Sequence, residues 1–182
     1  MTRIFPTLAL IAAATATRAD TFSADVWADN WFEMRINGVQ VAQDSVPITT
    51  ERSLNAESFI FEAQRPFVIG LMAKDFKEND TGLEYIGTRR QQMGDGGVIL
   101  QIMDAAGDLV AVSSADWSCL VIHTAPLDKS CESDADPVAG QGACGFDASS
   151  EPDGWDSVDF DATDWPAADV YSEREVSPKD GY

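Results

Sequence analysis

The segment that decides the fold is residues 31–42, which read Trp-Phe-Glu-Met-Arg-Ile-Asn-Gly-Val-Gln-Val-Ala. Side chains of an extended strand point alternately to opposite sides, so one face of this segment carries three apolar residues, Phe32, Met34 and Ile36. The alternation then meets Asn37-Gly38, a dipeptide suited to a type I′ turn because both central positions need a positive φ. The segment therefore predicts two antiparallel strands joined at Asn37-Gly38.

Short apolar runs separated by turn sequences continue along the chain to residue 124. The runs predict further strands at residues 58–63, 67–76, 98–103, 109–113 and 117–124, and residues 83–86 form either a short strand or a loop. No stretch has a sustained helical period. About seven or eight strands spaced by roughly ten residues predict an all-β fold, an antiparallel β-sandwich.

Composition limits the partners. The 182 residues include 31 acidic and 12 basic ones, a net charge of -19. Nucleic acid and anionic membrane surfaces repel such a chain, so we expect neither as a partner. The length fits one domain.

The first residues resemble a secretory signal peptide, with basic Arg3, an apolar run over residues 4–14 and small residues up to Ala19. Residues 1–19 are therefore predicted to be removed, with cleavage after Ala16 and a buried N-terminal helix as the alternatives. Removal leaves 10 basic and 31 acidic residues. No other apolar stretch is long enough to span a membrane. The sequence thus predicts a secreted or periplasmic protein.

The amino-acid composition of the chain changes near Pro126. Residues 20–127 hold the predicted sandwich core, whereas residues 128–182 contain 15 acidic and 3 basic residues with few apolar runs. This second part still has large aromatic residues, Trp155, Phe160, Trp165 and Tyr171. It is predicted to be an acidic, irregular extension that packs on the sandwich within the same domain.

Three segments also carry a family resemblance. They are Trp27 to Gly38, then Gly96 to Ile102 with Gly107 and Asp116-Trp117, and last Pro152 to Trp155 with Phe160 to Ala168. In this order they resemble galactose-binding-like jelly-roll domains, including the non-catalytic domains attached to rhamnosidases and other glycoside hydrolases. The resemblance implies a jelly roll with a binding or architectural role. Family members close the sandwich with a strand after the second Trp, so it also implies that this C-terminal strand is missing or comes from a partner.

Catalytic motifs are absent from the sequence. It has no P-loop, GxSxG or HExxH motif and a single histidine, His123. The nearest thiol, Cys119, lies four residues upstream, roughly 13 Å along a strand, which is too far for a catalytic dyad. We therefore expect His123 to be structural and the protein not to be an enzyme.

The best candidate ligand-binding residues are Trp31, Trp27, Glu33 and Arg35. Trp31 is out of phase with the apolar face of its strand, so it is expected to point outward, where an indole can stack on a pyranose ring. Trp117, in phase with Cys119, is expected to be buried instead. These residues predict a carbohydrate-binding module. The alternative is a structural or protein-interaction module that docks a partner strand at an open sheet edge.

No cofactor is expected, with calcium as the open alternative. Its candidate ligands are Asp134, Asp136 and Asp147, or Asp159, Asp161 and Asp164, and neither set has EF-hand spacing. Asp161 and Asp164 are also expected to cap the turn before Trp165.

Three cysteines in an oxidising compartment leave at least one unpaired within the chain. We expect Cys131 and Cys144 to form a disulfide and Cys119 to be buried. A bridge from Cys119 to one of the other two, or three reduced thiols, are the alternatives.

Overall fold

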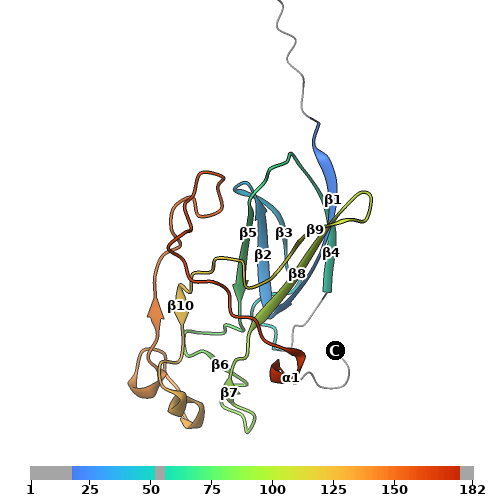
Figure 1. The fold of residues 1–182 in the computed structure, drawn as a ribbon. Coiled ribbons are helices and arrows are strands. Elements are labelled where there is room, and N and C mark those ends of the chain that lie inside the picture. Colours follow the sequence, from blue (N-terminus) through green and yellow to red (C-terminus); the bar gives the residue numbers. More distant parts are fainter. Residues whose placement is uncertain (1–17, 52–55, 177–182) are drawn as a thin grey trace, which may run out of the picture.

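The computed structural model describes residues 18–51 and 56–176, which form two packed antiparallel sheets (Figure 1). Sheet A has the strand order β4 (Ala56–Ala63), β1 (Asp20–Asp29), β8 (Gly97–Asp104) and β9 (Leu109–Val112). Sheet B has the order β3 (Val39–Gln43), β2 (Trp31–Ile36) and β5 (Ile69–Lys74). The predicted all-β sandwich is confirmed.

The core lies between the two sheets and is built from alternate strand residues. Its buried members are Phe22, Ala24, Val26, Ala28, Phe32, Met34, Ile36, Phe61, Ala63, Leu100 and Ile102. Phe22 stacks on Phe61 with ring centroids 5.4 Å apart, so β1 and β4 are also joined by an aromatic pair. Burying each large apolar side chain contributes roughly 1.5–3 kcal/mol, which makes this shared core the main stabilising element.

Both predicted hairpins are present. Asn37 and Gly38 have φ values of 50° and 79°, as a type I′ turn requires, and they join β2 to β3. The Asn37 side chain also joins this turn to the start of β5, because its Oδ1 accepts the N–H of Val68 at 2.8 Å. The second hairpin joins β8 to β9 through Gly107.

Two parts of the strand prediction were wrong. Strand β1, the centre of sheet A, was not predicted, because two of its four core positions are alanines and Ala is a weak strand former. The single strand expected at residues 117–124 is not formed. Ser118 makes an isolated bridge to Ala167, and only β10 (His123–Thr124) pairs, with β11 (Asp147–Ala148). Between them, Cys119 and Ile122 make backbone hydrogen bonds to Pro166 and Ser149, but no continuous strand forms.

Cys119 was expected to be buried and is exposed, because residues 118–121 lie outside both sheets and none of them is covered. The disulfide prediction is confirmed: Cys131 and Cys144 are bonded, with Cα atoms 5.0 Å apart. Both are fully buried against Leu83 of β6 (Leu83–Glu84). They belong to two short 3-10 helices, η1 (Lys129–Ser133) and η2 (Gly142–Cys144).

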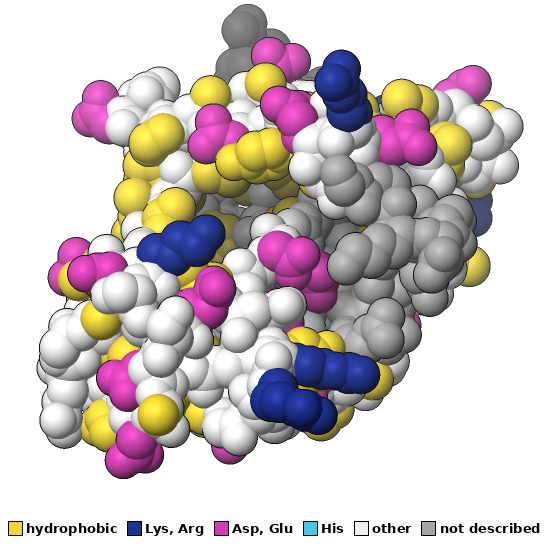
Figure 2. Space-filling view, turned by 90° about the horizontal axis from the view of Figure 1, so that it is seen from below, with side chains coloured by type: hydrophobic (Ala, Val, Ile, Leu, Met, Phe, Trp, Pro, Cys, Tyr) yellow, Lys and Arg dark blue, Asp and Glu magenta, His cyan; other side chains and the backbone are white. Residues whose placement is uncertain are grey.

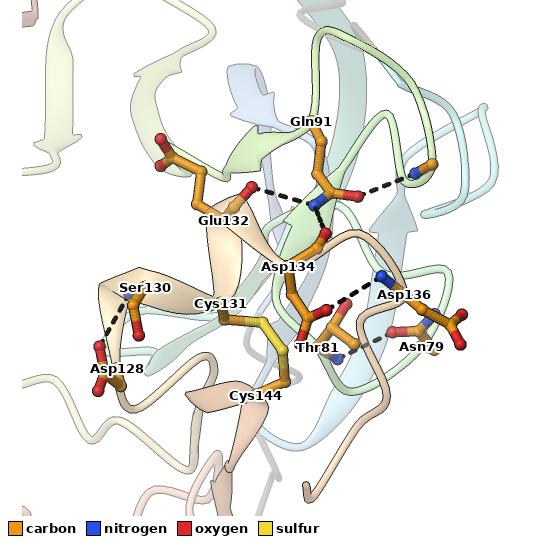
Figure 3. Close-up of a disulfide and its surroundings, with 11 residues drawn as sticks. Asn79, Thr81, Gln91, Asp128, Ser130, Cys131, Glu132, Asp134, Asp136 and Cys144 are labelled. Atoms are coloured by element: carbon orange, nitrogen blue, oxygen red, sulfur yellow. Dashed lines mark hydrogen bonds between the residues drawn. A yellow bond between two sulfur atoms is a disulfide. The ribbon is translucent and has the colours of Figure 1, made fainter. Parts of the chain in front are cut away.

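Figure 3 shows how the disulfide region is attached to the loop before β7 (Gln92–Met93). The Gln91 amide donates to the carbonyls of Glu132, at 3.0 Å, and Asp134, at 2.7 Å. Its Oε1 accepts the Gly87 N–H. One side chain thus joins the loop and the disulfide region.

The acidic extension follows the sheet B side of the sandwich (Figure 1). It contacts β5 closely at Gly70, where a Cβ atom would lie 2.9 Å from Asp156 Cβ and 3.1 Å from the Trp155 ring. Among the described residues after Trp165, only the helix α1 (Glu173–Val176) is regular, and the described part contains no helix suited to crossing a bilayer. Most of the proposed signal peptide lies outside the described residues.

Candidate functional site: a hollow at the end of the sandwich

A hollow of about 320 Å³ lies where the last residues of β1 and β5 meet the first residues of β8. Its lining residues are Asp29, Ala73, Lys74, Asp75, Gly96, Gly97 and Val98. Figure 2 views the molecule from below and shows the acidic and basic side chains that gather around the recess at this end. Both sheets contribute to the hollow, so the packing of the sandwich sets its shape.

Asn30 fixes the junction of β1 and β2 beside the hollow. Its side chain is fully buried, with Nδ2 donating to the Thr50 carbonyl at 3.2 Å and Oδ1 accepting the Phe76 N–H at 2.6 Å. Its own N–H donates to the Lys74 carbonyl. Two of these hydrogen bonds, with Lys74 and Phe76, hold the end of β5 beside the end of β1, and the third joins this junction to the loop at Thr50.

Asp75 holds the glycine-rich loop that forms the opposite wall. Its carboxylate accepts the N–H groups of Phe76 and Gly96. At Gly94 a Cβ atom would lie 1.7 Å from Asp75 Oδ2, and at Gly96 it would lie 2.8 Å from Asp75 Cβ. A side chain at Gly94 would displace the Asp75 carboxylate, and one at Gly96 would also press on the Asp29 carbonyl, so glycine favours the close approach of the loop. The sequence had indicated only a turn here.

Carboxylates crowd the hollow and change one another's protonation. Burial raises the pKa of Asp29 to about 6, and the charges of Asp95, Asp75 and Glu84 add to the effect. Burial also raises the pKa of Asp75 and of Glu84. Near pH 6 the Asp29 carboxyl group therefore exchanges between an acceptor and a donor of hydrogen bonds.

Trp31 borders the hollow through Lys74. The two residues are cross-strand partners in sheet B, and Lys74 Nζ lies 4.8 Å from the centroid of the indole ring. Trp31 is partly exposed, whereas its neighbour Phe32 is fully buried, as the alternation predicted. Aromatic, cationic and anionic groups are thus combined at one end of the molecule.

Trp27 approaches the hollow from the other sheet. It is partly exposed on β1, two residues before Asp29, and shares the outer face of sheet A with Asp29. Trp31 belongs to the outer face of sheet B, so the two indoles do not share one sheet face. The structure brings each of them next to a residue of the hollow instead.

Glu33 and Arg35 lie on the same outer face as Trp31, but they are engaged with the chain itself. Arg35 Nε donates to Glu33 at 2.5 Å, and Nη1 donates to Asp156 at 3.1 Å. Hydrogen bonds from the guanidinium group to the two carboxylates raise the pKa of Arg35. The ion pair between Arg35 and Asp156 therefore holds the acidic extension on sheet B.

His123 lies away from the hollow. Its Nε2 is 3.0 Å from Asp80 Oδ1, an oxygen that also accepts from Lys77, and its ring stacks on Phe146. A second, shallower hollow of about 240 Å³ borders it between β10 and β11. These contacts connect the extension to the loop before β6, which fits the structural role expected for this residue.

The remaining expectations concern Trp117 and calcium. Trp117 packs against the core while its Nε1 donates to the Val112 carbonyl, so it is only partly buried. Asp134 accepts the Asp136 N–H and Asp161 accepts the Thr163 N–H, so both carboxylates cap turns. Across residues 18–51 and 56–176 no group of three or more His, Cys, Asp or Glu side chains is arranged to hold a metal ion. Calcium binding stays an expectation without located ligands.

No protein-family model matches the chain, and no curated protein matches it. Among solved structures it is similar to the apo form of Pleurotus ostreatus lectin, with a TM-score of 0.47 and 16% sequence identity over 85% of this chain. The chain spans about a third of that lectin, since the match covers 32% of it.

Proposed function

We propose that the mature protein is a secreted, non-catalytic module that binds carbohydrate in the hollow beside Trp31. The observation that carries the proposal is the combination of Asp29, Lys74 and Asp75 in one hollow, next to a partly exposed indole. Sugar hydroxyl groups need paired donors and acceptors, and a pyranose also has an apolar face that packs on an aromatic ring. The hollow offers both kinds of contact.

A binding role suits these carboxylates better than a catalytic one. Asp75 is engaged with the N–H groups of Phe76 and Gly96, so it holds the loop in place. Trp31, Lys74 and Asp29 are left to contact a ligand. We therefore expect saturable glycan binding without turnover of glycosides.

The test is a glycan array followed by calorimetric titration with the best ligand, using wild type, Trp31→Ala and Trp31→Phe. Loss of the indole should weaken binding by about tenfold or more, equivalent to about 1.4 kcal/mol, and phenylalanine should restore part of it. Asp108→Asn, at the opposite end of the sandwich, is the control and should bind like wild type. Equal affinity of Trp31→Ala and wild type, or no glycan binding at all, would refute the proposal.

A protein-interaction module is the second candidate, and one observation favours it. The outer face of sheet A carries exposed aliphatic side chains, among them Ile60 and Ile99. A purely sugar-binding protein has no need of them. In that case a purified partner should bind while the glycan array stays blank.

A further inference from the structure

The outer face of sheet A carries an apolar surface that the hollow does not use. The strand register places three rows of side chains across this face. Two rows are mainly apolar, and the row between them is polar except for Val112. We call the apolar members the sheet A patch: Trp27, Ile60, Ile99, Met103, Leu109 and Val112.

The members of the patch share one face of sheet A. One row runs from Ile60 through Ser23 to Met103 and Leu109, so a serine lies between its first two apolar side chains. The other apolar row joins Trp27 to Ile99. Ile60 is 73% exposed, Ile99 61%, Leu109 59% and Val112 45%. Single exposed aliphatic residues are ordinary, but two apolar rows on one sheet face favour an interaction site.

The polar row contains Ser58, Asp25 and Gln101, and their side chains are already hydrogen-bonded to one another. Ser58 Oγ donates to Asp25 Oδ1 at 2.5 Å, and Gln101 Nε2 donates to Asp25 Oδ2 at 2.8 Å. These two hydrogen bonds lower the pKa of Asp25. Both oxygens of the carboxylate therefore keep partners when water is removed, so a docking surface need not supply them.

The charges around the patch indicate what kind of surface fits it. Glu62 lies on the same face beyond Ile60, and Asp29 lies on it beyond Trp27. Among the described residues, Arg65 is a cation close to this face, and it lies within 4 Å of both Asp20 and Asp104, which balance its charge. The rim is acidic at both ends. A second copy of the chain would place acid against acid, whereas a basic rim would be attracted.

We propose that the sheet A patch docks a partner protein whose contact surface has an apolar centre bordered by lysine or arginine. The apolar rows supply the contact area, and the acidic ends favour and orient the basic border. The surface meets the hollow beside Trp27, at Asp29, but Ile60, Ile99 and Leu109 do not line the hollow. The docking proposal therefore stands whether or not the glycan proposal does.

The probe is a synthetic peptide of alternating isoleucine and threonine with lysines at both ends, titrated by calorimetry. The matched peptide has glutamates at its ends. The protein variant is Ile60→Ser with Ile99→Ser, which removes apolar area without changing charge. Val39→Ser is the control, because Val39 is 65% exposed on β3 of sheet B.

We expect the lysine peptide to bind wild type and Val39→Ser alike, to bind the double variant about tenfold more weakly or worse, and the glutamate peptide not to bind. Circular dichroism and thermal melting of the double variant confirm that it is folded. Equal binding to the double variant and wild type would overturn the proposal, and so would no binding of the lysine peptide. Self-association of wild type that the double variant loses would assign the patch to a second copy instead.

Discussion

The two sheets share the same alternation of buried and outward side chains, but their outer faces differ in what covers them. Strands β1 and β2 are consecutive, and in both every second side chain enters the shared core. On sheet A the remaining side chains stay largely open, with Ile60 and Ile99 exposed. On sheet B the extension lies against the surface, with Trp155 and Asp156 at Gly70.

Alternation therefore decides which residues enter the core, but not what covers the opposite face of each sheet. Arg35 donates a hydrogen bond to Asp156, which lies 121 residues further along the chain. A local pattern holds no information on such a contact. The hollow lies at the end where both faces meet, so it draws its residues from each sheet.

The largest expected effect comes from opening the disulfide in the extension that covers sheet B. Cys131→Ser with Cys144→Ser should lower the free energy of unfolding by about 3 kcal/mol, because the bond closes a loop in the unfolded chain. Urea denaturation measures the loss. Limited proteolysis should then cut first between residues 128 and 147. An unchanged urea midpoint would show that the bond does not constrain the extension.

The next effect separates the covered face from the open one. Gly70→Val should cost roughly 1–3 kcal/mol, because its side chain would press on Trp155 and Asp156. Gly97→Val is the matched control at the start of β8, where a Cβ atom would meet nothing within 4 Å. It should leave the thermal midpoint nearly unchanged. Equal destabilisation of both variants would erase the distinction between the faces.

A smaller effect measures the ion pair that fastens the extension. The Asp156 side chain is 10% exposed and the Arg35 side chain 33%, so solvent screens their attraction in part. A double-mutant cycle with Arg35→Met and Asp156→Asn should give a coupling energy of about 0.5–1 kcal/mol that falls as salt is added. A coupling near zero at low salt would mean that Trp155 packing alone holds the segment.

The smallest effect tests the hollow through pH. The pKa of Asp29 is about 6 in the folded protein and 3.8 ordinarily, so the folded state binds more protons between these values. Its contribution to stability is therefore fully present below about pH 4 and is lost as pH rises through 6. Asp29→Asn should raise stability at pH 7 by less than about 1 kcal/mol, because the group is half exposed and screened.

Asp25, on the same strand, should affect stability in the opposite direction from Asp29 at pH 7. Hydrogen bonds from Ser58 and Gln101 lower the pKa of Asp25, so its contribution is present at neutral pH and lost in acid. Asp25→Asn should therefore lower stability at pH 7. Urea titrations at several pH values measure both variants, and a shift of the same sign in both would contradict the assigned environments.

Much of the fold could be predicted from the sequence, because its signals are local. The Asn37-Gly38 turn, the alternation of β2 and the spacing of the strands each depend on a few adjacent residues. Strand β1 was not predicted because alanine is a weak strand signal in the sequence. Ala24 and Ala28 are buried only because the two sheets pack on either side of them. Cys119 was misplaced because residues 118–121 lie outside both sheets, so the alternate side chains of this segment have no core to enter.

The candidate site was reached only in part. The phase of Trp31 indicated an outward indole, but Lys74, Asp75 and the glycine loop come from three other segments of the chain. Their meeting depends on the packing of β5 and β8 against β1. A signal was available in Gly94 and Gly96, since glycine is favoured where the backbone approaches another group closely. It was interpreted only as a turn.

Hydroxyl-radical footprinting of the native protein, with labelling normalised to each residue's intrinsic reactivity, tests most directly whether the two outer faces differ. Ile60 and Ile99 on sheet A should be labelled freely, and the Trp155 ring over sheet B should be protected. Gly70→Val should increase labelling of Trp155 without changing that of Ile60. Protection of Ile60 and Ile99 together with free labelling of Trp155 would contradict the account.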